Sequence, residues 1–391
     1  MKVIVVGAGV GGLTLAQGLR REGIEVRVYE RDGPQRRRQG VSLHLDDRGM
    51  TALSACLPPA HLKMAQAAMG RQRDRTQVLS EVAGELTVVR SEPLNGGAGG
   101  VRAGRQVDRP LLRAVLLHGL EDAVRFGAPF TRFETRANGT VRVYFGDGSV
   151  DTADALIGAD GVGSAVRRQL LPQVRVIDTG KRMLMGAAPL ATVADTVLLT
   201  RIGDNATSAQ VRGRIVVLGV LRFTEPPVTA RDRWLPDLHA AAVTGAEDYV
   251  MWAMPVTPDQ LGSADSPHSV WHRARSLARG LPAPLLDVID GAWPHATVAL
   301  RIGMIPPTPA WPAGPVTVIG DAIHAAPGFG GNLAMRDAYR LRDALARTAR
   351  GQEDLVAAIG AVEHDMRSDN HAVKPVSAAQ HRSASHSRWH E

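Results

Sequence analysis

Cysteine is almost missing from this chain, since Cys56 is the only one. A single cysteine excludes an intramolecular disulfide and any zinc site built from several cysteines, which fits a reducing compartment. Long apolar runs are also missing, because no stretch approaches the roughly 18 residues that a membrane-spanning helix needs. The apolar start at Val3–Val6 ends in glycines rather than in a signal-peptide cleavage site. We therefore expect a soluble, cytoplasmic protein with no membrane partner.

Lysine and aromatic residues are scarce as well. Only Lys2, Lys63, Lys181 and Lys374 are lysines, and aromatic residues make up 4% of the chain. The net charge of +7 therefore comes from arginines, which are interspersed with acidic residues and are densest at positions 36–38. Without a basic patch and aromatic stacking platforms, we expect no nucleic-acid partner.

The composition is that of a globular protein, with 44% hydrophobic and 22% charged residues. A length of 391 residues favours two domains. Residues 2–6 form a β-branched apolar run typical of a buried parallel strand, and apolar residues at helical spacing follow between Leu13 and Leu19. A second strand is predicted at Glu25–Tyr29. This βαβ unit predicts an α/β, Rossmann-like fold at the N-terminus.

Further along, the pattern changes twice. Between about residues 174 and 294, strand-like stretches broken by Pro-rich turns indicate a separate antiparallel domain, and a buried strand at 316–319 then resumes the parallel fold. The first domain is therefore predicted to be discontinuous. The predicted boundaries are 1–65, 101–172 and 296–373 for the α/β domain, 66–100 and 173–295 for the antiparallel domain, and 374–391 for a Ser/His/Arg-rich disordered tail.

The first turn carries a dinucleotide-binding motif, with Gly7, Gly9 and Gly12 placed as G-x-G-x-x-G between strand and helix. Gly7 permits the tight turn, Gly9 lets the backbone approach a pyrophosphate, and Gly12 lets the helix pack on the sheet. The pyrophosphate would sit at the positive N-terminus of the helix. Glu30, at the end of the second strand, is placed to accept hydrogen bonds from a ribose 2′-hydroxyl. These residues alone leave NAD and FAD open.

Two further stretches bear a resemblance that separates these cofactors. Residues 155–167, ALIGADGVGSAVR, resemble the Asp-Gly motif of the para-hydroxybenzoate hydroxylase family of flavoprotein monooxygenases, and residues 318–327, VIGDAIHAAP, resemble its second FAD motif. The resemblance implies that the discontinuous domain binds FAD and that the inserted antiparallel domain binds substrate. It also implies NAD(P)H as a transient co-substrate, since no second dinucleotide fingerprint is present.

The resemblance implies roles for five residues. Asp321 would bond the ribityl hydroxyls of FAD, and Asp160 would lie near the pyrophosphate and the route of NAD(P)H. Pro327 would border the flavin ring. Arg109 matches an arginine that the family uses against FAD, and Arg38 resembles a flavin-contacting arginine of the tetracycline-inactivating members.

Simpler roles remain open for several of these residues. Asp160 and Asp321 follow strands, so each is also a candidate helix N-cap. Arg167 is as consistent with a structural ion pair as with a ligand contact. Arg38 is equally consistent with a solvated arginine run, and His324 is interpreted as structural.

One departure from the family lies after Pro327. The family continues with G-x-G-x-N, whereas the segment from Pro327 to Asn332 is about two residues shorter here. The loop that borders the flavin is therefore expected to differ. We still expect a helix to begin near Gly331 and Asn332 and to face the pyrimidine side of the flavin, where its N-terminus favours negative charge.

The function that follows is an FAD-dependent monooxygenase that uses NAD(P)H and O2. The resemblance implies a flavin C4a-hydroperoxide that hydroxylates an aromatic or polycyclic small molecule. No metal-ligand or nucleophile constellation competes, and no catalytic side chain or oligomeric state is assigned. A flavin reductase or dehydrogenase on the same fold, and a flavin-binding protein without turnover, remain alternatives. Four residues are conceivable pocket lining and equally plain core: Met183, Met185, Met251 and Trp252.

Overall fold

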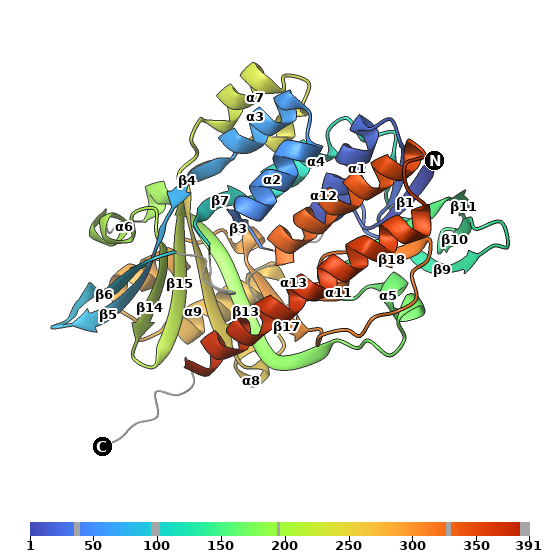
Figure 1. Ribbon diagram of the computed structural model, residues 1–391. Helices are drawn as coiled ribbons and strands as arrows, with labels where there is room; N and C mark the ends of the chain where they lie inside the picture. Colours follow the sequence, from blue (N-terminus) through green and yellow to red (C-terminus); the bar gives the residue numbers. More distant parts are fainter. Residues whose placement is uncertain (35–39, 95–101, 194–195, 326–329, 384–391) are drawn as a thin grey trace.

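The structure is a computed structural model that describes residues 1–34, 40–94, 102–193, 196–325 and 330–383, with side chains up to residue 369. Its first layer is a five-stranded sheet in which each neighbouring pair is parallel (Figure 1). In spatial order the strands are β18 (Val316–Val318), β12 (Ala155–Gly158), β1 (Lys2–Val6), β2 (Glu25–Tyr29) and β8 (Val124–Arg125). The predicted Rossmann-like unit is thus present, and strands from three distant parts of the chain share one sheet.

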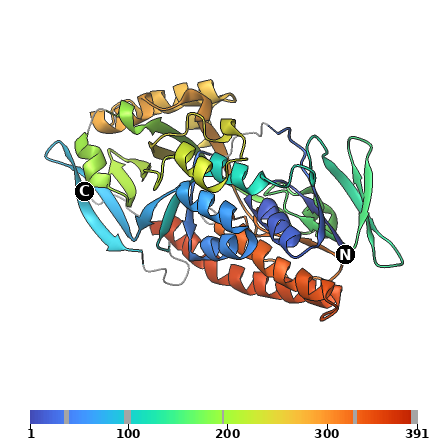
Figure 2. The same ribbon diagram turned by 90° about the horizontal axis from the view of Figure 1, so that it is seen from above.

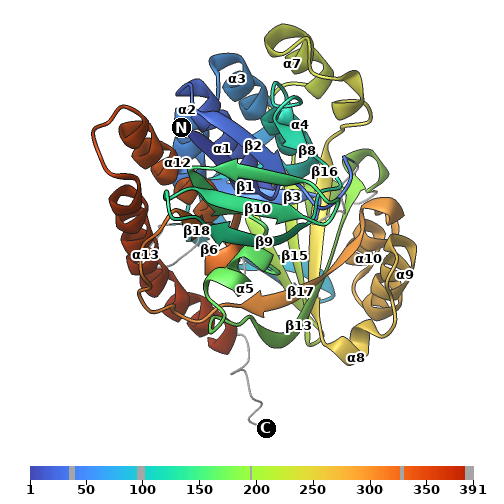
Figure 3. The same cartoon turned by 90° about the vertical axis from the view of Figure 1, so that its right-hand side faces the viewer.

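The alternation of side chains along β1 explains how both faces of this sheet are buried. Val3 and Val5 point into a core shared with α1 (Val10–Arg21) and α12 (Gly330–Ala349), whereas Ile4 and Val6 point to the opposite core. A three-stranded antiparallel sheet covers that opposite face (Figure 3). Its strands are β9 (Phe130–Thr135), β10 (Val141–Phe145) and β11 (Val150–Ala153).

The second layer is a seven-stranded, largely antiparallel sheet. In spatial order its strands are β17 (Val298–Met304), β13 (Ile177–Pro189), β16 (Tyr249–Val256), β15 (Arg214–Leu221), β14 (Ala206–Val211), β5 (Arg75–Val82) and β6 (Glu85–Pro93). The sequence predicts this antiparallel insertion, but β17 pairs with β13 and so extends it past the predicted boundary at residue 295. The short apolar run of β17 gave no signal of its partner strand.

A third, small sheet joins the two layers. It consists of β3 (Ser42–Asp46), β7 (Gly104–Asp108) and β4 (Met69–Arg73), and both β7 and β4 contact β15 of the large sheet. The remaining helices are α2 (Asp47–Cys56), α3 (Pro59–Ala67), α4 (Arg109–Leu117), α5 (Ala165–Leu170), α6 (Thr196–Ile202), α7 (Pro227–Trp234), α8 (Pro258–Leu261), α9 (Pro267–Ala278), α10 (Ala283–Asp290), α11 (Asp321–His324) and α13 (Leu355–Ser383). Short 3-10 turns lie at Leu190–Thr192, Ala240–Ala242 and Pro294–Ala296.

Helices close the outer faces of the molecule. The red helices α12 and α13 run side by side along one side, and α9 and α10 cover the large sheet on the other side (Figure 2). Helix α13 continues to Ser383, into the segment from residue 374 that the sequence analysis assigns to a disordered tail. Extending an existing helix costs less than nucleating one, so a segment without apolar periodicity can continue it. Within the described residues, no helix is both long enough and apolar enough to cross a membrane.

Helix α13 buries an acid against the parallel sheet. Glu363 is 1% exposed and lies beside Thr317 and Trp311. Burial raises the pKa of Glu363 because desolvation disfavours the charged form and outweighs the opposing effects of Thr317, Trp311 and Arg367. An acid whose pKa is higher in the folded than in the unfolded chain lowers the stability as pH rises from the unfolded pKa through the folded pKa.

We predict that Glu363→Gln removes this penalty. The free energy of unfolding of the variant should exceed that of the parent by more at pH 8 than at pH 5. At pH 8 the penalty that is removed is about 1.4 kcal/mol for each unit by which the pKa is raised. Chemical denaturation at both pH values measures the difference, with the exposed Glu85→Gln as control. A Glu363→Gln effect that is equal at both pH values would contradict the assignment.

Candidate functional site

A cavity of about 490 Å³ opens at the carboxyl ends of β1, β12 and β18. Ligands of open α/β sheets bind at this edge, outside the strand ends. The lining combines residues from all three motifs of the sequence analysis, although they are far apart in the chain. The predicted residues that line it are Gly7, Gly9, Glu30, Arg109, Asp160, Asp321 and Gly331.

The glycine turn after β1 has the geometry that its motif predicts. Gly7 has φ +108°, and a Cβ there would lie 2.5 Å from the carbonyl oxygen of Ala159. A Cβ on Gly12 would overlap the carbonyl oxygen of Gly7, so Gly12 serves the packing of α1 and does not line the cavity. Gly9 is the N-cap of α1 and does line it. The positive end of α1 therefore faces the cavity, as an anion site requires.

Glu30 is held in place by backbone donors. Its Oε2 accepts from the amide of Ala8 at 2.8 Å, and its Oε1 accepts from the amide of Asp32 at 3.1 Å. The side chain is 5% exposed, and the residue lines the cavity beside Tyr29 and Phe130. Two backbone bonds fix the carboxylate at this end of the cavity, and each oxygen retains a lone pair for a ligand hydroxyl.

Asp160 lines the cavity and also contacts the start of α5. Its Oδ2 accepts from the amides of Ala165 at 2.7 Å and Val166 at 3.3 Å, although the N-cap residue of α5 is Ser164. Its Oδ1 is buried and has no partner within the described residues, although the residue lines the cavity. An unsatisfied buried oxygen is costly, so a ligand or water donor at this position would be stabilising.

Arg167 has the structural role. It is 2% exposed and donates to the carbonyl oxygen of Ala322 at 2.7 Å and to that of Val162 at 2.9 Å. Burial lowers its pKa. The guanidinium thereby ties the Asp-Gly motif to the second cofactor motif, and it does not line the cavity.

Asp321 is the first residue of α11 and opens onto the cavity. Its carboxylate makes no hydrogen bond within the described residues, and the surrounding protein raises its pKa by desolvation, against the opposing charges of Arg109 and His324. A Cβ on Gly330 would overlap Asp321 Oδ1, so the carboxylate lies directly against the start of α12. A carboxylate left without donors is suited to accept bonds from ligand hydroxyls.

A buried pair supports the turn that presents Asp321. His324 Nε2 and Asp337 Oδ2 lie 2.6 Å apart, and the same Oδ2 accepts from the amide of Gly320 at 3.1 Å. Desolvation favours a higher pKa for Asp337, but the charge and hydrogen bond of His324, together with Arg336, lower it overall. The sequence favours a structural role for His324 but does not predict Asp337 as its partner. Because thirteen positions separate them on two helices, spacing alone gave no sign of the contact.

The start of α12 also faces the cavity, as the sequence predicts. Helix α12 begins at Gly330, and Gly330 and Gly331 both line the cavity. Asn332 does not: its side chain is 2% exposed, accepts from the amide of Asp46 at 3.0 Å and donates to the carbonyl of His44 at 2.8 Å. Both groups of the Asn332 side-chain amide therefore bond to β3 and link α12 to that strand. Two other predicted cofactor residues, Arg38 and Pro327, lie outside the described residues.

The residues proposed as pocket lining divide between the two faces of the large sheet. Trp252 is fully buried in the core beneath α9 and α10, so it is core rather than lining. Met183, Met185 and Met251 are half-buried on the opposite face, toward the α/β domain. Met185 lies 3.7 Å from the position of a Cβ on Gly40.

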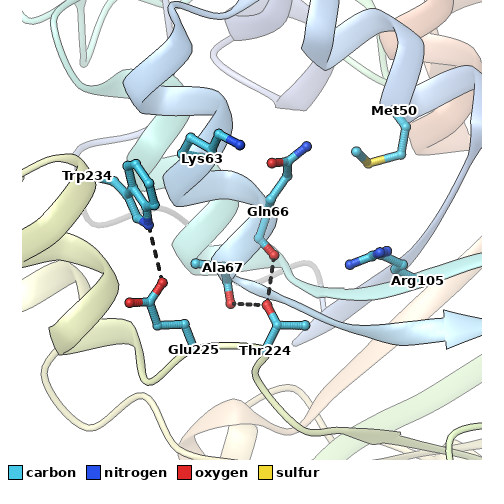
Figure 4. Close-up of a pocket in the computed structure, with 8 residues that line it drawn as sticks. All are labelled: Met50, Lys63, Gln66, Ala67, Arg105, Thr224, Glu225 and Trp234. Atoms are coloured by element: carbon cyan, nitrogen blue, oxygen red, sulfur yellow. Dashed lines mark hydrogen bonds between the residues drawn. The ribbon is translucent and has the colours of Figure 1, made fainter.

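A separate hollow of about 380 Å³ lies between α3 and α7 (Figure 4). Two of its polar side chains bond to neighbouring residues: Thr224 donates to the carbonyls of Gln66 and Ala67, and Trp234 donates to Glu225 at 3.2 Å. It shares no lining residue with the large cavity. Within the described residues, no group of three or more His, Cys, Asp or Glu side chains could hold a metal ion.

The polar groups that line the cavity fit FAD. They are a helix N-terminus suited to a pyrophosphate, a fixed carboxylate beside Tyr29, and two carboxylates with free acceptor capacity. Glu30 would hold the adenosine ribose, the turn at Gly9 the pyrophosphate, and Asp321 the ribityl hydroxyls.

Two variants test these contacts. Gly9→Val should abolish retention of FAD because a side chain there occupies the space that the pyrophosphate needs. Asp321→Ala should raise the FAD dissociation constant by about 10- to 100-fold, since it removes charge-assisted hydrogen bonds worth about 1.5–3 kcal/mol. Gly314→Val, at a position with nothing nearby, is the control. Dissociation constants equal to that of the parent would refute the assignments.

Known proteins resemble this chain over most of its length. A dual O-methyltransferase/FAD-dependent monooxygenase, elcB of Phaeosphaeria nodorum, is 29% identical over 94% of this chain, which spans 43% of that protein. A crystal structure from Photorhabdus luminescens, assigned as an FAD-containing monooxygenase, is 28% identical with a TM-score of 0.79 over the whole of both chains. Klebsiella pneumoniae HpxO, solved with FAD and uric acid, shares the fold at 24% identity and a TM-score of 0.72, over 98% of this chain and 92% of its own.

The family match covers the segments that form the cavity. Residues 1–197 and 308–357 match the family described as FAD binding domain, and they contain all three motifs. The cavity and this match lead to one conclusion: the chain belongs to the FAD binding domain family, and FAD is its cofactor.

Proposed function

We propose that this protein is a monooxygenase that uses NAD(P)H and O2 to hydroxylate an aromatic or polycyclic small molecule. When bound, FAD supplies the redox chemistry, which is hydride acceptance from the nicotinamide and reaction of the reduced ring with O2. The names of two relatives support the proposal: elcB is named a dual O-methyltransferase/FAD-dependent monooxygenase, and the Photorhabdus luminescens structure is described as an FAD-containing monooxygenase.

One observation in this chain favours an apolar substrate. Met183, Met185 and Met251 line up on the face of the large sheet that is turned toward the cofactor domain, and they are only half-buried. Their neighbour on the same face, Leu300, pairs with Met183 and lines the cofactor cavity. Flexible thioether side chains beside a cofactor provide an adaptable apolar wall for a flat ring. Such a wall also excludes water from the reacting centre.

The start of α12 has a defined task in this proposal. Its N-terminus at Gly330 and Gly331 faces the cavity, and a helix N-terminus stabilises nearby negative charge by about 0.3–1 kcal/mol when exposed and up to about 2 kcal/mol when partly buried. It would therefore favour the reduced, negatively charged flavin. Among the described residues, a Cβ on Gly331 meets only Leu43, at 3.9 Å, so we expect a substitution there to act on the ligand.

We predict that NADH or NADPH reduces the bound FAD without oxygen, that an aromatic substrate accelerates the step, and that Gly331→Val slows it. Stopped-flow absorbance under anaerobic conditions measures the rate, and oxygen uptake with product analysis follows in air. Oxidation of NAD(P)H that yields no oxygenated product with any of a panel of phenols, quinones and polycyclic aromatics would favour a reductase. A flavin that dithionite reduces but neither nucleotide does would favour a binding protein without turnover.

A further inference from the structure

A positive charge without a carboxylate partner is buried between the small and the large sheet. Arg73, the last residue of β4, is 5% exposed and forms no salt bridge within the described residues. Its Nη2 donates to Gln106 Oε1 and to the carbonyl oxygen of Val220, the latter at 2.8 Å. Both acceptors are neutral. Buried charges in proteins are normally paired or bound to a ligand, so Arg73 calls for an explanation.

The neighbouring polar groups do not neutralise this charge. Asp204 is the acid that acts on Arg73, but it pairs with Arg222 at 3.3 Å. Tyr249 donates to the carbonyl oxygen of Val41, and burial raises its pKa well above the ordinary value, so it stays neutral. Desolvation lowers the pKa of Arg73 to about 10, which leaves the guanidinium protonated at neutral pH.

Gln106 presents its carbonyl oxygen to Arg73 because its amide is committed elsewhere. Gln106 Nε2 donates to Ser42 Oγ at 3.0 Å and to the carbonyl oxygen of Gly219 at 3.3 Å. A Cβ on Gly219 would lie 2.5 Å from Gln106 Oε1 and 2.9 Å from Arg73 Nη2. The Arg73–Gln106 pair thus lies directly against the large sheet at Gly219.

The same sheet face leads from Arg73 to the cofactor cavity. Gly219 pairs with Met251, and Ala253, two residues further along β16, pairs with Met185. Met183, two residues from Met185, pairs with Leu300, which lines the cofactor cavity. Paired residues and residues two apart share one face of a sheet. An apolar row therefore connects the cofactor cavity with the buried guanidinium.

We propose that Arg73, held by Gln106, binds an anionic oxygen of the substrate, and that the substrate is therefore an aromatic anion whose ring lies along the methionine row. This inference rests on the proposed function. The substrate site then has an apolar wall along the methionine row and a charged end at Arg73. The anionic group of the substrate pairs with the Arg73 guanidinium, which has no carboxylate partner within the described residues.

The test uses the FAD-bound protein and two matched probes, 1-naphthoate and its neutral counterpart 1-naphthamide. Each is titrated at pH 8 while the visible absorbance of the bound FAD is recorded, so binding is measured without turnover. The parent protein should bind the anion at least about ten-fold more tightly than the amide, as expected for a hydrogen bond to a charged group. Arg73→Met should abolish that preference and leave the affinity for the amide unchanged within about three-fold.

A second variant guards against a folding defect. Gln106→Glu keeps the side-chain shape and supplies Arg73 with an internal carboxylate, so the anion preference should vanish. Because the variant also loses the donor to the Gly219 carbonyl, thermal unfolding and retention of FAD confirm that it is folded. Arg214→Met, at the exposed start of β15, is the control and should keep the preference. Failure of the parent to prefer the anion, or persistence of the preference in both variants, overturns the inference.

The outcomes separate this inference from the proposed function. If neutral aromatics are oxygenated while Arg73→Met has no effect on anion binding, the monooxygenase remains and the role of Arg73 is wrong. If Arg73 governs anion binding but no aromatic compound stimulates NAD(P)H oxidation, the anion site remains and the proposed reaction is wrong.

Discussion

The close approach of two backbone turns organises the cofactor site. The turn after β1 passes so near the end of β12 that a side chain on Gly7 would collide with Ala159. This contact brings the N-terminus of α1, the acid of the Asp-Gly motif and the start of α11 to one edge of one sheet. The cavity exists because three strand ends from distant parts of the chain meet there, and the polar groups that line it depend on that meeting.

Behind this edge, buried polar ties hold the motifs in register. Arg167 joins the Asp-Gly motif to the carbonyl of Ala322, and Asp337 holds both Gly320 and His324. Of these five residues, only Gly320 lines the cavity. Such ties fix the acceptors before a ligand arrives, so less ordering accompanies binding.

The sequence predicts the motifs better than it predicts their supports. Gly7, Gly9 and Glu30 follow from local strand and turn patterns, and the order of the motifs indicated an interrupted α/β domain. The sequence did not predict the contacts that support these motifs. Asp160 bonds the start of α5, His324 pairs with Asp337, and Asn332 links α12 to β3. Each contact depends on how the chain folds around the motif rather than on a local pattern. Arg73 carried no local signal either, since its burial depends on where β4 meets β15. The pairing of β17 with β13 likewise depends on contacts between distant segments rather than on composition.

The central claim, that the cavity at the end of the parallel sheet holds FAD without a covalent bond, is tested most directly by the flavin that the purified protein carries. The protein is denatured, and the released cofactor is identified by absorbance and mass. We expect FAD, one per chain and fully released. A protein that binds NAD tightly but neither retains nor takes up FAD would contradict the account.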